Sequence, residues 1–213
     1  MSIHVRRKIL MRRTKEESEE TKNTILNTSI KLFSQKGYSR TTLCEIAKES
    51  HVTRGAIYWH FKNKLEIFDA LYERLHRPFV QMILEDISKD HPEPLIQLQD
   101  ICIQLFLDLE KDSHKRQAIS LFLIKCDYTG ELKAYRRKHN ERKTQSMNLF
   151  ILYFKKAQEK NKISKEENPY LMALSINCYM KGILIEYLSS PESLIAQKDI
   201  PKLIKLFFRG IKG

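Results

Sequence analysis

The stretch TTLCEIAKESHVTRGAIYWHFKNKLEIF, residues 41–68, carries the clearest structural signals in the chain. Thr42 followed three residues later by Glu45 forms a capping box, in which the hydroxyl accepts the Glu45 N–H while the carboxylate reaches back. This pair predicts a helix that begins directly after Thr42. Thr53 can cap a second short helix, RGAIYWHF, only a few residues downstream. Two short helices joined by such a turn are typical of a helix-turn-helix, here over residues 42–61.

The flanking segments predict two longer helices. Residues 15–36 carry apolar side chains at helical spacing, and Gly37 stands where a left-handed cap is needed. Asn63 with Glu66 forms another cap pair, which opens a helix that ends by Asp90 at the latest. The apolar side chains of this stretch are expected to form a small core that holds the short helices together: Leu43, Cys44, Ile46, Ala47, Val52, Ile57 and Phe61.

The second short helix has the chemistry expected of a DNA-reading element. Arg54 in its first turn has forked donors that suit guanine O6 and N7, and Gly55 leaves room for close approach to a duplex. The helix beginning at Thr42 can offer backbone N–H groups to a phosphate. Trp59 fits a DNA-facing surface or a core position equally well. Further phosphate donors stand at and beyond the end of this helix, namely Tyr58, His60, Lys62 and Lys64.

The charge is concentrated near the N-terminus. The chain of 213 residues has a formal net charge of +12, and residues 1–64 carry 14 basic and six acidic side chains. Residues 1–14 have five basic side chains and no acidic one, which predicts a flexible basic arm. A basic N-terminal segment followed by a longer segment of nearly balanced charge indicates that the partner is a polyanion.

The rest of the chain predicts an all-α body. Glycine and proline number six each, which is few for a turn-rich sandwich or barrel. About nine helices are expected overall, with residues 65–213 forming one larger helical domain. AISLFLI, in a helix expected at about 114–126, is apolar all round and indicates burial on most sides. The other expected helices of this domain begin near 95, 131, 169 and 200.

Residues 169–188 are apolar on nearly every side, but Asn177, Lys181 and Glu186 argue against a membrane span. A helix lying between its own core and a partner subunit satisfies both observations. Together with the last helix, at about 200–210, it predicts a homodimer through the last two helices.

No chemistry of an enzyme is visible in the sequence. There is no glycine-rich phosphate loop, no GxSxG and no HExxH, and the four cysteines have no zinc-ligand spacing. We therefore expect no catalytic site, no metal and no cofactor. No secretory signal pattern is present, so a reducing cytoplasm is expected.

The stretch from Lys15 to Phe68 resembles the N-terminal domain of the TetR family of bacterial transcriptional repressors. VTRGAIYWHFKNK, residues 52–64, is close to the form of the AcrR-type branch, which controls multidrug efflux pumps. LFLIKCDYTGEL, residues 121–132, resembles the ligand domain of that branch more weakly. His51 departs from the pattern, because relatives often place glycine there, and a left-handed His51 is expected to keep the turn intact.

The resemblance implies that Arg54 reads bases, and that Thr42, Thr53, Tyr58, His60 and Lys64 contact or position phosphates. It also implies a palindromic operator in double-stranded DNA and a small-molecule inducer in the helical body. Aromatic or polar positions on buried helix faces are candidates to line that site, although each also fits plain core: Phe106, Phe122, Cys126, Tyr135, Phe150, Tyr153 and Tyr179. Three carboxylates are candidates to receive a cationic drug: Glu110, Asp127 and Glu186. The alternative function is an architectural protein that binds nucleic acid nonspecifically and has no inducer.

Overall fold

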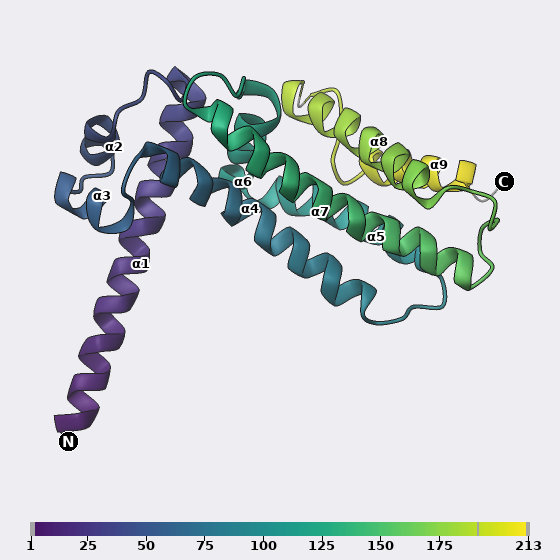
Figure 1. Cartoon of the computed structure of the whole chain (residues 1–213), viewed down its shortest axis with the longest axis horizontal. Coiled ribbons are helices and arrows are strands. Elements are labelled where there is room, and N and C mark those ends of the chain that lie inside the picture. The colour runs from purple at the N-terminus through teal and green to yellow at the C-terminus, as the bar shows by residue number, and fades with distance from the viewer. Residues whose placement is uncertain (1–2, 191, 212–213) are drawn as a thin grey trace. The chain divides into compact units, whose positions relative to one another are not determined.

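The computed structural model describes residues 3–190 and 192–211, with side chains described from residue 14 onward, and these residues form helices and loops without strands. That part of the chain contains nine α-helices and one short π-helix, η1; the α-helices are labelled in Figure 1. Their bounds are α1 Ile3–Lys36, α2 Leu43–Glu49, α3 Arg54–His60, α4 Lys64–Ile87, α5 Pro94–Lys111, α6 Ser113–Ser120, η1 Leu121–Lys125, α7 Leu132–Glu159, α8 Pro169–Ser189 and α9 Asp199–Ile211. The predicted all-α class is confirmed.

The chain divides into two compact units inside α4, between Glu73 and Arg74. The sequence placed the end of the DNA-binding domain at Lys64, where α4 begins. Residues 3–14 of the predicted flexible arm form the first part of α1, whereas the sequence predicted a helix only from residue 15; the flexibility of the arm stays a prediction.

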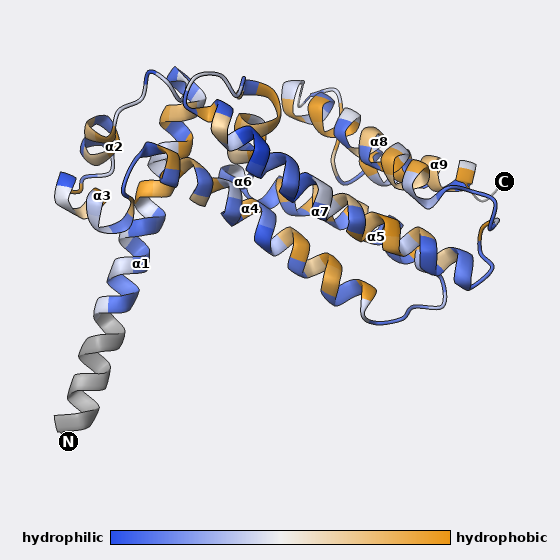
Figure 2. Cartoon of the chain, viewed as in Figure 1, coloured by the Kyte–Doolittle hydropathy of each residue, from blue (hydrophilic) through white to orange (hydrophobic). Residues whose placement is uncertain are grey.

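The first unit is held together by an apolar centre shared by α1 to α4. Ile25, Ile46 and Ile57 are fully buried there, one from each of the first three helices. Among the coloured residues of α1 in Figure 2, the hydrophobic ones stand in the C-terminal part of the helix. Phe33 of α1 and Phe68 of α4 both pack against Tyr38, with ring centroids 5.3 Å apart in each pair. Burying each such side chain contributes roughly 1.5–3 kcal/mol.

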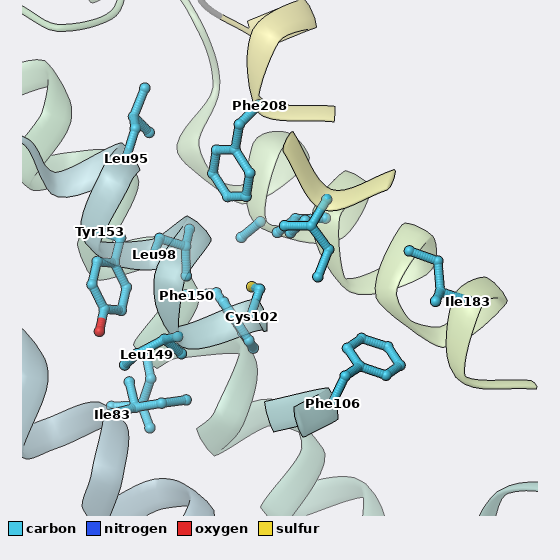
Figure 3. Close-up of a cluster of buried hydrophobic side chains, with 14 of the residues drawn as sticks. Ile83, Leu95, Leu98, Cys102, Phe106, Leu149, Phe150, Tyr153, Ile183 and Phe208 are labelled. Carbon is cyan, nitrogen blue, oxygen red and sulfur yellow. The ribbon is translucent and has the colours of Figure 1, made fainter. Parts of the chain in front are cut away.

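The second unit has its core between α5, α7, α8 and α9. Figure 3 shows Cys102, Phe150, Ile183 and Phe208 converging from these four helices, with Ile83 of α4 beside them. All five side chains are buried. The apolar residues of α5 and α7 stand at helical spacing, and this spacing gives each of the two helices a face that packs into the core.

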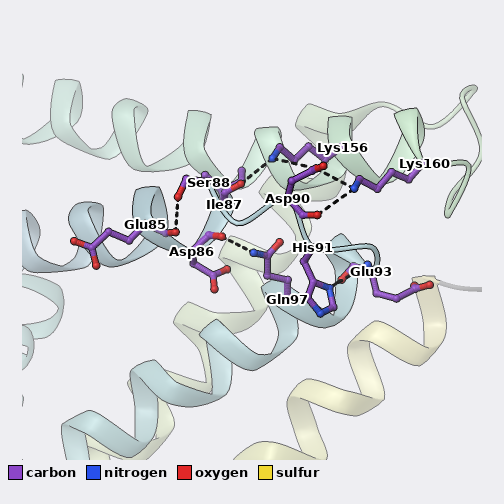
Figure 4. A network of polar contacts seen from close by, with 10 residues as sticks. All are labelled: Glu85, Asp86, Ile87, Ser88, Asp90, His91, Glu93, Gln97, Lys156 and Lys160. Atoms are coloured by element: carbon purple, nitrogen blue, oxygen red, sulfur yellow. Dashed lines mark hydrogen bonds and ion pairs between the residues drawn. The ribbon is translucent and has the colours of Figure 1, made fainter.

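The connection between α4 and α5 is fixed to the end of α7 by charged side chains (Figure 4). Lys160 Nζ lies 2.9 Å from Asp90 Oδ1, and Lys156 Nζ donates to the Ile87 carbonyl at 2.7 Å. Asp90 itself has a φ of 45°, a left-handed conformation. The hydroxyl of Tyr153 donates to Asp86 Oδ2 at 2.8 Å. These contacts attach the loop to α7 at several points.

One prediction about packing is wrong. The apolar segment expected at about 114–126 is not a helix buried on most sides, because it changes into the π-helix η1 and leaves Ile124 43% exposed. Leu121 and Phe122 of the same segment are buried. In α7, Leu152 is likewise 41% exposed. In both helices the apolar run is longer than the face that packs.

Candidate functional site

The start of α2 is fixed by the predicted capping box. Thr42 Oγ1 accepts the Glu45 N–H at 3.2 Å, and Glu45 Oε2 accepts the Thr42 N–H at 2.9 Å. Lys36 Nζ at the end of α1 lies 3.0 Å from Glu45 Oε1. The backbone hydrogen bond from Thr42, followed by the Lys36 contact, lowers the pKa of Glu45 to about 2. The capping carboxylate is thus charged and attached to α1 as well as to α2.

The turn between α2 and α3 is a Schellman motif centred on His51. The His51 N–H donates to the Lys48 carbonyl at 3.1 Å, and the Val52 N–H donates to the Ala47 carbonyl at 3.0 Å. His51 has a φ of 54°, the left-handed conformation that the sequence predicted. Thr53 Oγ1 then accepts the Ala56 N–H at 3.1 Å and opens α3. The helix-turn-helix is therefore present, with both predicted caps.

Helix α3 has a buried face and an exposed face. Ile57 is fully buried, and Phe61 directly after the helix is 4% exposed. Tyr58 is 50% exposed and Trp59 is 81% exposed. Since α3 has only seven residues, this division places Arg54, Tyr58 and Trp59 on the solvent side. The two neighbouring aromatic side chains and Arg54 form one exposed group on this face, which makes it a candidate contact surface.

Arg54 and Tyr58 are linked across one turn of α3. Hydrogen bonding of the guanidinium to the Tyr58 hydroxyl is the main reason why the pKa of Arg54 is raised. Gly55, between them and exposed, has room for a Cβ, whose nearest neighbour would be Thr53 Oγ1 at 3.7 Å. No described neighbour of Gly55 therefore requires a glycine at this position.

The predicted phosphate donors after Tyr58 differ in their surroundings. Burial, followed by the charge of Lys22, lowers the pKa of His60, so this side chain is a neutral donor at pH 7. Lys62 is exposed, and its N–H donates to Glu66 Oε2 at 2.6 Å. The Glu66 N–H donates to Asn63 Oδ1 at 2.9 Å, which confirms Asn63 as the cap of α4.

Lys64 makes contacts that sequence reasoning missed. Its ammonium group donates to the carbonyls of Tyr38 at 2.9 Å, Ser39 at 3.3 Å and Thr41 at 3.0 Å. The same Nζ lies 4.3 Å from the centroid of the Tyr38 ring. Lys64 therefore ties the start of α4 to the loop before α2. The sequence shows only that a lysine stands next to apolar positions at the start of a helix. This pattern does not indicate which loop the lysine contacts.

Cys44 corrects the predicted small core. It is exposed rather than buried, and it lies near Arg54 on the outward side of α2. Leu43 and Val52 are only partly buried, whereas Ile46 and Ala47 are buried as expected.

The candidate ligand residues fall into separate groups. Phe106, Phe150 and Tyr153 belong to the main core of the second unit, and Tyr179 packs against it. Tyr179 donates its hydroxyl to the Leu203 carbonyl at 2.8 Å and stacks on Phe207 at 5.0 Å. Since Tyr153 binds Asp86, both hydroxyls already have partners within the unit.

The other candidates lie outside that core cluster. Phe122 and Tyr135 are buried, while Cys126 and Glu110 are partly buried. Arg142 Nη1 donates to the Tyr135 hydroxyl at 2.8 Å. The two remaining acids are exposed and already hold neighbours: Asp127 accepts Thr129 Oγ1 at 2.9 Å, and Glu186 accepts Ser193 Oγ at 3.0 Å. Within the described part of the chain, no cluster of three histidine, cysteine or acidic side chains could hold a metal ion.

Comparison with known families identifies both units. Residues 25–71 match the model described as bacterial regulatory proteins, tetR family. Residues 93–212 match the C-terminal region of MAATS-type transcriptional repressors, which covers more than half of the chain. The chain belongs to the TetR family. It is a transcriptional regulator and not an enzyme, as the sequence predicted.

Relatives of the AcrR type match this TetR-family chain over most of its length. TtgR of Pseudomonas putida, an HTH-type transcriptional regulator, is 30% identical over 92% of this chain and 93% of its own. AcrR of Shigella flexneri is 30% identical over 89% of this chain and 88% of its own. The crystal structure of NalD from Pseudomonas aeruginosa superposes with a TM-score of 0.80, at 28% identity over 92% of this chain and 98% of that chain.

Proposed function

We propose that this regulator represses a multidrug efflux operon and leaves its operator when a small lipophilic compound occupies the second unit. NalD is described as the secondary repressor of the MexAB-OprM multidrug efflux pump, and the similarity to it extends over both units. The repressor would act in the cytoplasm, where its operator is accessible.

The observation that carries the DNA-binding part is the outward face of α3. Arg54, Tyr58 and Trp59 stand together on a short helix that two capped turns hold in place. Arg54 would read guanine in the major groove, while Thr42, Thr53, Tyr58, His60, Lys62 and Lys64 would contact or position phosphates. Gly55 and Trp59, on the same exposed face of α3, would also lie against the duplex.

Assembly as a homodimer is supported by the exposed face of α8. Six of the exposed residues of this helix stand at alternating intervals of four and three: Leu171, Ser175, Cys178, Gly182, Ile185 and Ser189. We call these six residues the α8 seam. Such spacing is that of a helix seam that packs on another helix.

The positions of the α8 seam are symmetric about residue 180. When two copies pack antiparallel, Cys178 of one meets Gly182 of the other, and Ser175 meets Ile185. A two-fold axis requires such self-complementarity. Among the helices of the described residues, α8 alone is long and apolar enough to cross a membrane, yet Lys181 lies within it. A second subunit covers the seam without placing that lysine in lipid.

The test is selection from random double-stranded DNA, followed by affinity measurements on the selected sites. The proposal expects an inverted repeat whose half-sites lie one helical turn or a related spacing apart. It expects at least about a thousandfold preference over random DNA. Equal affinity for all sequences would favour the alternative, an architectural protein without an inducer.

A further inference from the structure

The positive charge of the second unit is concentrated at the start of α7. Residues 132–143 hold six basic side chains and one acidic side chain. The whole unit, Arg74–Gly213, holds 24 basic and 17 acidic side chains. This short stretch of helix therefore carries most of the excess positive charge of the unit.

The helical repeat places most of these cations on one exposed face. Positions three, four and seven apart along a helix lie on the same side. Leu132 and Tyr135 are buried on the other side of α7. Six exposed residues have this spacing, and we call them the α7 stripe: Lys133, Arg136, Arg137, Asn140, Lys143 and Thr144.

The α7 stripe does not stabilise the helix that bears it. Lys133 and Arg137 stand four residues apart, and like charges at this spacing repel each other. Arg137 Nε lies 3.3 Å from Glu141 Oε1, but these side chains are 90% and 64% exposed, so the ion pair contributes little. A partner of opposite charge would replace the repulsion by attraction.

The chemistry of the surrounding surface narrows the kind of partner. The exposed residues among 132–145 are polar or charged, apart from Ala134. An anionic membrane would require an apolar face that enters the lipid, and the core of a protein interface is apolar. Single-stranded nucleic acid is held by stacking on aromatic rings, and Tyr135 is buried. A surface of cations and hydrogen-bonding groups fits the phosphates of a duplex.

The side chains of the α7 stripe are those that contact DNA phosphates. A guanidinium group donates two parallel hydrogen bonds to a phosphate, and asparagine and threonine also contact phosphate oxygens. From Lys133 to Thr144 the helix rises by about 16 Å, and phosphates of one strand follow at roughly 3.4 Å along the duplex axis. The α7 stripe is therefore long enough to meet several phosphates.

Helix α4 connects the α7 stripe to the DNA-reading part of the chain. His76 of α4 approaches α7 beside the stripe, with its Nε2 atom 3.0 Å from Ser146 Oγ and 3.2 Å from the Arg142 carbonyl oxygen. The same helix begins at Lys64, directly after the helix-turn-helix.

We infer that the α7 stripe is a second DNA contact, which binds phosphates of the duplex whose bases α3 reads. The inference goes beyond the proposed function, which assigns all DNA contacts to the first unit. Because phosphates are the same at every base pair, the α7 stripe adds affinity without adding sequence preference.

The test compares two triple variants of the full chain by titrating a labelled duplex at several salt concentrations. The first variant removes three cations of the α7 stripe: Lys133→Gln, Arg136→Gln and Arg137→Gln. The matched control removes three exposed lysines elsewhere in the second unit: Lys155→Gln, Lys165→Gln and Lys198→Gln. The two variants have the same net charge, so any difference between them reflects the position of the cations. Circular dichroism and sedimentation velocity check that both are folded dimers.

The stripe variant is expected to bind a long duplex that carries the selected inverted repeat about tenfold or more weakly than the control does. Each lost phosphate contact should reduce the slope of log K against log salt by about 0.9, or roughly two to three in total. A random duplex should show the same losses. Arg136→Lys with Arg137→Lys keeps both charges and should keep most of the affinity.

Equal affinity and equal salt dependence of the two triple variants would overturn the inference. A loss confined to the selected sequence would also overturn it, and so would a stripe variant that no longer forms the wild-type dimer, because the α7 stripe would then join copies of this chain. Failure of the proposed function looks different, since the wild type would then show no preference for an inverted repeat. Binding to a random duplex tests the α7 stripe without that preference.

Discussion

Arg54 is the residue on which base recognition should depend most. It is exposed in the first turn of α3, and the Tyr58 side chain one turn away is the main cause of its raised pKa. Arg54→Ala should cost about 1–3 kcal/mol in operator binding and relax the preference at one base position. Affinities for the operator and for single-base variants measure both effects. Equal loss on all sequences would instead make Arg54 a phosphate contact.

Gly55 separates the requirements of folding from those of DNA binding. A Cβ there meets only Thr53 Oγ1 at 3.7 Å, so Gly55→Ala should leave the free energy of unfolding unchanged or raise it by up to about 1 kcal/mol. Operator affinity should nevertheless fall, because α3 could no longer approach the duplex as closely. Denaturant unfolding and DNA titration of the same variant decide the matter. Undiminished affinity would remove Gly55 from the interface.

Lys64 is expected to act mainly by holding the loop before α2. Lys64→Met removes the ammonium donor from three carbonyls, of which that of Tyr38 keeps the Thr41 N–H, and should lower the free energy of unfolding by about 1–3 kcal/mol. The exposed Lys62 is the matched control, and Lys62→Met should leave unfolding unchanged. Unchanged stability in Lys64→Met, with the salt dependence of DNA binding reduced by about one, would instead assign Lys64 to a phosphate.

Single side chains show where sequence reasoning succeeds and where it ends. Thr42, Glu45, Thr53 and His51 were predictable, because their partners lie within a few residues along the chain. The contacts of Lys64 were not, because they join residues more than twenty positions apart. The exposure of Cys44 depends on which side of a seven-residue helix packs, and so short a helix has too few apolar positions to define that side.

At the scale of elements, the capping box of α2 predicts a response to acid. Glu45 has a pKa of about 2 in the folded protein, below its ordinary value of 4.5. A group with a lowered pKa stabilises the folded state above pH 4.5 and loses that contribution as the pH falls towards 2. Glu45→Gln, which keeps a capping side chain but cannot titrate, should therefore show a weaker loss of stability over this range.

Chemical denaturation of wild type and Glu45→Gln between pH 5 and pH 2 measures this difference. Glu49→Gln, at the exposed end of the same helix, is the matched control and should follow the wild type. Parallel curves for wild type and Glu45→Gln would contradict the role of the charged box.

Helix positions were predicted well where caps or prolines mark them, and less well elsewhere. The ends of α2 and α3, and the start of α8 at Pro169, follow from local signals. The change from α6 to η1 has no comparable mark, because residues 121–125 carry apolar side chains that suit either kind of helix. The packing around residues 121–125 decides which kind of helix they form.

For the whole molecule, the α8 seam makes dimer formation the property to test. Ile185 is 45% exposed on the seam, and Ile124 of η1 is 43% exposed away from it. Ile185→Arg should dissociate the dimer, because two symmetric copies would bring two charges into one apolar interface. Ile124→Arg should leave the dimer intact. Sedimentation velocity measures both, and a stable dimer of Ile185→Arg would move the interface elsewhere.

Family and fold class were accessible from the sequence, since the helix-turn-helix signals are local and distinctive. The grouping of ligand candidates was not, because burial alone cannot separate Phe106 of the core from Phe122 outside it. His139 of α7 has basic neighbours on two other helices, His76 of α4 and Lys181 of α8, and only the folded chain brings them together.

The α8 seam also has a genetic consequence. Its positions lie far along the chain from α3, so a copy damaged at Arg54 keeps the surface with which it pairs to an undamaged copy. Mixed dimers of this kind would carry one working helix-turn-helix, whereas binding to a palindrome requires two. In cells that carry both forms, alleles altered in α3 should therefore be dominant, whereas alleles altered in the seam should be recessive because their products pair with nothing.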